Sequence, residues 1–116
     1  MKDKIFEVVG QEFIKEAPVL IIPAIDAEKS VMPVQDLSVA SENMFLQAAA
    51  LGLGTVWKSI SWKGVRPGAE EKIKNLLGIP GKYKIINIIP VGYPKVKPKA
   101  YTNREFDDNK IHKEKW

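Results

Sequence analysis

PVQDLSVASENMFLQAAAL, residues 33–51, predicts one long helix that carries apolar side chains almost all the way round. A helix without a polar face is typical of a protein interior. Its alanines allow close approach of another helix at a subunit interface or of a sheet, and both uses stay open. One apolar stripe contains Leu37, Ala40, Met44, Ala48 and Leu51, and a second contains Val39, Leu46 and Ala50, with Asn43 among them.

Signals at both ends of this stretch agree with a helix. Pro33 suits a first-turn position, and Asp36 lies near the positive end of the helix dipole. Gly52 or Gly54 supplies the left-handed residue that ends the helix.

The flanking segments predict a small sheet and two further helical regions. Residues 17–25 and 84–92 are apolar runs without alternation, so we expect strands covered on both faces, the first of them central in the sheet. Residues 55–57 predict a third, short strand. A helical pattern over about 4–15 is interrupted at Gly10. Another helix begins after Pro67, contains a Glu70–Lys74 pair and ends at Gly78, which gives an α+β domain.

Composition limits the possible classes. The 116 residues suffice for one domain, and 45% hydrophobic with 28% charged residues is ordinary for a soluble protein. Cysteine is absent, so we expect no disulfide or thiolate chemistry and a cytoplasmic setting. The longest apolar run is far shorter than the roughly 20 residues of a membrane span. The net charge is +4, but acidic residues lie among the basic residues. We therefore expect neither membrane nor nucleic-acid binding.

The C-terminal segment differs from the rest. Residues 93–116 are polar, rich in proline and lysine, and too poor in apolar side chains to form their own core. A sheet of three strands beside a helix that is apolar on every side is also incompletely covered. We therefore expect a partner subunit, a core over residues 1–94 and an extension over residues 95–116.

Four stretches in a fixed order then resemble the nitroreductase family. They are EAPVLII (16–22), VQDLSVASENMFLQAA (34–49), LGLGTVWKS (51–59) and IIPVGYP (88–94), followed by a closing HKEKW (112–116). The resemblance implies an FMN-binding homodimer that passes electrons from NAD(P)H to small electron-poor acceptors. It also implies that the long helix packs at the dimer interface and that residues 95–116 wrap the other subunit.

The same resemblance points to cofactor-binding residues. It places Trp57, Lys58, Ser59 and Ile60 along the flavin ring, although many relatives have glycine where Ile60 stands. It places the basic residues Lys99 and Arg104 at the FMN phosphate.

Each of these assignments has a structural alternative. Trp57 and Trp62 can fill a core instead of stacking on flavin, and Lys58 can be an ordinary surface lysine. No catalytic residue is assigned, since flavin chemistry requires no acid–base side chain here. His112 is the single histidine, and no metal site is expected.

Two segments typical of the family have no counterpart in this sequence. These are an Arg-x-Ser-x-Arg segment and a Pro-Ser-x-x-Asn-x-Gln-Pro loop, so we expect a truncated fold that lacks its N-terminal part. Losing them removes electrostatic support for reduced flavin. A catalytically silent dimerisation module that does not hold flavin is therefore the alternative function. A small nucleic-acid binder is a third, supported only by the charge excess.

Overall fold

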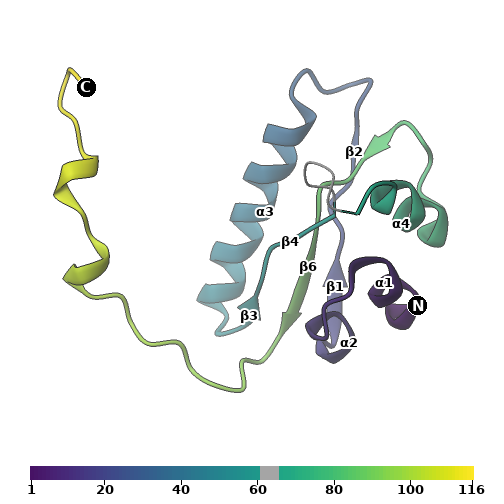
Figure 1. The fold of residues 1–116 in the computed structure, drawn as a ribbon, viewed down its shortest axis with the longest axis horizontal. Coiled ribbons are helices and arrows are strands. Elements are labelled where there is room, and N and C mark those ends of the chain that lie inside the picture. Colours follow the sequence, from purple (N-terminus) through teal and green to yellow (C-terminus); the bar gives the residue numbers. More distant parts are fainter. Residues whose placement is uncertain (61–65) are drawn as a thin grey trace.

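The structure is a computed structural model that describes residues 1–60 and 66–116. A small antiparallel sheet lies between α3 on one side and α1, α2 and α4 on the other (Figure 1). The predicted α+β fold is confirmed. The helices are α1 (Lys2–Val9), α2 (Phe13–Glu16), α3 (Pro33–Ala50) and α4 (Ala69–Leu77), and the strands are β1 (Val19–Ile21), β2 (Ile25–Asp26), β3 (Gly54–Thr55), β4 (Lys58–Ser59), β5 (Tyr83–Lys84) and β6 (Asn87–Gly92).

Strand β6 is the centre of the main sheet. It pairs with β1 along one edge and with β3 and then β4 along the other, always antiparallel. Strands β2 and β5 form a separate two-stranded ladder. The buried strand predicted over 84–92 is thus confirmed for β6, which is buried from Asn87 to Pro90 and ends at Gly92.

The prediction of one central strand over residues 17–25 is wrong. The run divides around Pro23 into β1 and β2, which belong to different sheets. Strand β1 has β6 as its only strand neighbour among the described residues, and Val19 and Ile21 are 52% and 37% exposed. An apolar run predicts that both faces of a strand are buried, but the described chain buries only one face of β1.

The structure has two short strands, β3 and β4, in place of the single strand predicted over residues 55–57. Thr55 pairs with Val91 and Lys58 with Ile88, so β3 and β4 share a single register along β6. That register places Val56 opposite Pro90. Proline has no N–H to donate, and the ladder is interrupted at this point.

The main core lies between the sheet and α1, α2 and α4. Gly10, with φ 60°, ends α1 as predicted, and Gly78, with φ 67°, ends α4. Buried isoleucines and valines from these helices meet the α1 side of β6. The core residues are Ile5, Val9, Ile14, Ile60, Ala69, Ile73, Ile85 and Ile88.

The predicted Glu70–Lys74 pair is wrong. Glu70 instead accepts from Lys84 Nζ at 2.8 Å and from the Ile85 N–H at 3.2 Å. The Lys74 ammonium lies 2.7 Å from Glu71. Glu70 therefore joins α4 to β5, a tertiary partner that helical spacing cannot predict.

Helix α3 begins and ends as predicted but is buried on one side only. Pro33 and Asp36 lie in its first turn, and Gly52 follows its end with φ 70°. Leu37 and Ala48 are buried, whereas Val39 is 63% and Leu46 61% exposed. The prediction of a helix buried all round is therefore wrong for the single chain.

Residues 93–116 leave the domain as an extended segment with two short 3-10 turns, Asn103–Glu105 and Asp108–Lys110 (Figure 1). Every residue of this tail is exposed, so the prediction that it has no core of its own is confirmed. Within the described chain, no helix has the length and apolar character to cross a bilayer.

We predict that Gly92→Ala destabilises the fold by about 1–3 kcal/mol through overpacking. A Cβ at Gly92 would lie 2.8 Å from Pro18 Cδ, and the proline ring has little freedom to move. The matched control is Gly81→Ala, whose Cβ would meet nothing within 4 Å. Urea unfolding of both variants measures the difference, and equal midpoints would contradict the prediction.

Candidate functional site

Strand β4 offers an open backbone edge. Ile60 N–H donates to the Ile86 carbonyl at 3.0 Å, and Lys58 and Ser59 pair with Ile88 and Asn87. Since N–H groups alternate in direction along an antiparallel strand, the Ser59 N–H points away from β6. Within residues 1–60 and 66–116 no other strand pairs with β4, so this donor faces the open edge.

Trp57 is held beside that edge. Its Nε1 donates to Ser59 Oγ at 2.9 Å, and its ring meets Phe45 of α3 edge-on, with 6.2 Å between ring centroids. The side chain keeps 37% of its surface exposed. Trp57 is thus an oriented, half-exposed aromatic surface, positioned by both the strand and the helix.

Lys58 projects from the opposite face of β4. It pairs with Ile88, whose side chain belongs to the core beneath α1, and residues directly opposite in an antiparallel pair share a face. Burial lowers the pKa of the Lys58 ammonium below its ordinary value, and the positive charge of Arg66 lowers it further. A partly buried ammonium is thus held beside the Ser59 edge.

The other predicted site residues lie elsewhere. The Ile60 side chain is only 1% exposed and packs in the core. Lys99 and Arg104 lie in the exposed tail, where the hydrogen bonds of residues 99–116 join tail residues to one another in the described chain. Residues 57–60 thus form one local group, and Lys99 and Arg104 lie apart from it on the tail. Trp62 lies outside the described residues.

A buried polar pair connects β6 to α3 directly behind β4. Asn87 Nδ2 donates to Ser41 Oγ at 3.0 Å, and the Ser41 hydroxyl donates to the Leu37 carbonyl at 2.7 Å. Both residues have no exposed surface. Sequence reasoning singled out the exposed Asn43 instead. The sequence did contain a signal for the Ser41–Asn87 pair, because Asn87 is a single amide side chain within an apolar strand.

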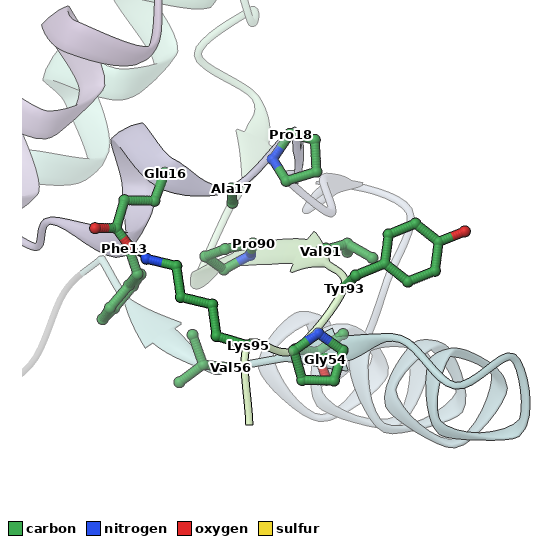
Figure 2. A pocket seen from close by; sticks show the side chains of 13 residues that line it. Phe13, Glu16, Ala17, Pro18, Gly54, Val56, Pro90, Val91, Tyr93 and Lys95 are labelled. Atoms are coloured by element: carbon green, nitrogen blue, oxygen red, sulfur yellow. Dashed lines mark ion pairs between the residues drawn. The ribbon is translucent and has the colours of Figure 1, made fainter. Parts of the chain in front are cut away.

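Two hollows lie near β3 and β6 without touching residues 57–60. One of about 370 Å³ opens between α2 and the ends of β3 and β6, with Glu16 and Lys95 at its mouth, 3.7 Å apart (Figure 2). This exposed ion pair contributes little stability. The other, of about 530 Å³, separates α3 from the sheet face that carries Ile21, Ile89 and Val91. Residues 57–60 therefore line neither of these two hollows.

Comparison with known proteins identifies the fold. A family model described as "Nitroreductase family" matches residues 1–93. The chain belongs to the nitroreductase family. An FMN-dependent nitroreductase from Clostridium difficile R20291 superposes with a TM-score of 0.87 at 31% identity, over 100% of this chain and 72% of its own. The resemblance drawn from sequence motifs is confirmed.

Two archaeal members of the nitroreductase family are also similar in sequence. Both carry the provisional name NADH dehydrogenase/NAD(P)H nitroreductase. The protein of Methanothermobacter thermautotrophicus is 42% identical over 108 residues, and that of Archaeoglobus fulgidus 35% over 112 residues. These alignments cover 89% and 90% of this chain but only 53% and 62% of the relatives. The chain thus spans little more than half the length of these relatives.

The donors at β4 fit the ring end of an FMN molecule. A flavin ring presents oxygen and nitrogen acceptors along one edge and becomes anionic when reduced. The outward Ser59 N–H and the Lys58 ammonium are a matching donor and cation, and Trp57 adds a flat apolar surface. The phosphate end needs charged donors, and the residues predicted from the sequence for that role, Lys99 and Arg104, lie on the tail.

We predict that Ser41→Ala costs about 1–3 kcal/mol of stability, because the buried Asn87 amide loses its partner. Ser38→Ala on the same helix is the control, since Ser38 donates only to the Val34 carbonyl at an exposed position. Its cost should stay below about 0.5 kcal/mol. Adding Asn87→Leu to Ser41→Ala should cost less than the sum of the single changes. Urea unfolding tests this, and equal effects of the two serine variants would contradict it.

Proposed function

We propose that this chain acts in an FMN-dependent oxidoreductase that passes electrons from NAD(P)H to nitroaromatic, quinone or similar small acceptors. Its membership of the nitroreductase family and the names of its relatives support the reaction class. The observation that carries the proposal is the open β4 edge, where the Ser59 N–H faces outward between Trp57 and Lys58.

The residues of this edge have separate tasks in the proposed site. FMN held there would supply the redox chemistry between the nicotinamide and the acceptor. The Ser59 N–H would donate to an acceptor atom at the ring edge and so orient the ring. The Lys58 ammonium stabilises negative charge near the ring. Trp57 provides the flat surface that excludes water from one side.

We propose further that two chains assemble into a homodimer. In the single chain α3 exposes Val39 and Leu46, and apolar burial of this kind drives association. The tail also carries exposed apolar residues, which are available for burial against another surface. These residues are Val96, Tyr101, Phe106, Ile111 and Trp116.

A tail that docks on the partner also explains the placement of the tail cations. Lys99 and Arg104 lie between the apolar residues of the tail, apart from β4 of their own chain. In a tail-exchanged dimer they would serve the FMN phosphate of the partner's site. The division into a core over residues 1–94 and a wrapping extension over 95–116 belongs to this proposal. The cytoplasmic setting stays a prediction.

The alternative is a catalytically silent dimerisation module that does not hold flavin. One observation favours it: the donors that surround β4 in the described chain fit the ring but leave the phosphate without cations from the same chain. Flavin retention separates the two functions.

We predict that the purified chain, incubated with FMN and desalted, retains the flavin's yellow absorbance and oxidises NADH or NADPH when a quinone or nitroaromatic is added.

Lys58→Met should weaken FMN binding about tenfold, as expected for one lost hydrogen bond from a charged group. Lys29→Met, which removes the same charge from an exposed turn, is the control. Fluorescence titration with FMN measures affinity. A folded wild-type chain that retains no FMN would favour the silent module.

We predict a dimer in light scattering, and monomers for Leu46→Asp, because a carboxylate at an apolar interface loses its hydration without a partner. Ala27→Asp adds the same charge at an exposed turn and should remain dimeric. A wild-type chain that is monomeric at micromolar concentration would contradict the assembly.

A further inference from the structure

Two contacts from different elements hold Trp57 at the β4 edge. Its indole Nε1 donates to Ser59 Oγ at 2.9 Å. Its ring meets Phe45 of α3 edge-on, with 6.2 Å between the ring centroids and an angle of 64° between the ring planes. Aromatic pairs prefer this edge-to-face arrangement at such distances. The hydrogen bond restricts the direction of the indole N–H, and the Phe45 contact restricts the tilt of the ring.

Trp57 and Ser59 project from the sheet face that α3 covers. Ser59 pairs with Asn87, and residues directly opposite each other in an antiparallel pair share a face. The Asn87 side chain bonds to Ser41 of α3, which places this face beneath the helix. Trp57 lies two positions before Ser59, and its contact with Phe45 shows that it points to the same side. The aromatic surface at β4 and helix α3 therefore lie on one side of the sheet.

The Ser41–Asn87 bond sets the position of α3 along the sheet, and that position brings Phe45 to Trp57. Phe45 follows Ser41 by four positions, so the two side chains lie on one face of the helix, separated by a rise of about 6 Å. Trp57 precedes Ser59 by two positions, a distance of about 7 Å along a strand. Because Ser59 lies opposite Asn87, the two spacings begin at the same level and nearly match. The buried hydrogen bond thus presents Phe45 to Trp57.

We propose that Phe45 is a positioning residue, which together with the Ser59 hydroxyl holds Trp57 in one orientation for a planar ring at the β4 edge. The inference rests on the proposed function, in which this ring belongs to flavin. Phe45 contacts Trp57 and acts through it. A side chain that is already ordered loses little conformational freedom when a ligand packs against it, so the positioning strengthens binding of the ring.

The first test measures Trp57 in the full chain without flavin. The chain has three tryptophans, and the variant Trp57→Phe identifies which indole N–H signal in an NMR spectrum belongs to Trp57. Phe45→Leu should speed the exchange of this N–H with water about fivefold, the effect expected when one edge-to-face aromatic pair no longer supports the hydrogen bond to Ser59. Ser59→Ala should speed it as well, and Phe45→Tyr, which keeps the ring, should restore the wild-type rate.

Phe6→Leu is the matched control for Phe45→Leu. Phe6 is partly buried against the core on the other side of the sheet, so the same substitution there loosens packing without touching Trp57. The indole exchange rate should stay at the wild-type value in this variant. An unchanged rate in Phe45→Leu, or an equal increase in Phe6→Leu, would overturn the proposal.

The second test measures binding of the ring itself by fluorescence titration with FMN and with riboflavin, which lacks the phosphate. Phe45→Leu should weaken both about fivefold, because the lost contact acts on the ring end alone. Wild-type affinity of Phe45→Leu for both flavins would also overturn the proposal. A wild-type chain that binds neither flavin would contradict the proposed function, and the indole exchange rate would still decide whether Phe45 positions Trp57.

Discussion

Strand β6 is the one strand of the described chain that is hydrogen-bonded along both edges, and the remaining architecture depends on it. Its alternating side chains divide the molecule into two sides. Ile88 enters the core beneath α1 and α4, whereas Asn87 and Ile89 face α3. The Asn87–Ser41 bond then fixes α3 over the strand at the level of β4.

A single proline in β6 shapes the candidate site. Because Pro90 lacks an N–H, the ladder on the second edge is interrupted at Val56 and resumes at Lys58. Trp57 lies within this interruption. Its indole N–H donates to Ser59 Oγ, and its ring contacts Phe45 edge-on. The outward Ser59 N–H follows from the same register. The site is therefore built from strand geometry, with α3 and α1 as its supports.

The surfaces that the single chain leaves uncovered belong to the proposed assembly. An apolar stripe on α3, an apolar hollow between α3 and the sheet, and a tail with regularly spaced apolar residues are all exposed in one copy. The cations expected at the FMN phosphate lie on that same tail. In the proposed dimer, function and assembly are coupled, since the residues proposed for the flavin ring lie on β4 and the cations proposed for the phosphate lie on the tail.

The fold class, the long helix with both its ends, the break at Gly10 and the family followed from the sequence alone, because propensity, capping and motif order are local properties. Residues 57–60 were singled out because they lie within one motif, and their role at a flavin stays a prediction. Partners distant in the chain could not be found this way: Glu70 with Lys84, Asn87 with Ser41, and Arg66 with the end of α1. The sequence shows Pro23 and Pro90 but not their effect on the strands. That effect depends on whether a neighbouring strand would use the N–H group that proline lacks. Only the tertiary structure decided these points, because hydrogen-bond and charge partners are chosen by proximity in space, which residue spacing does not specify.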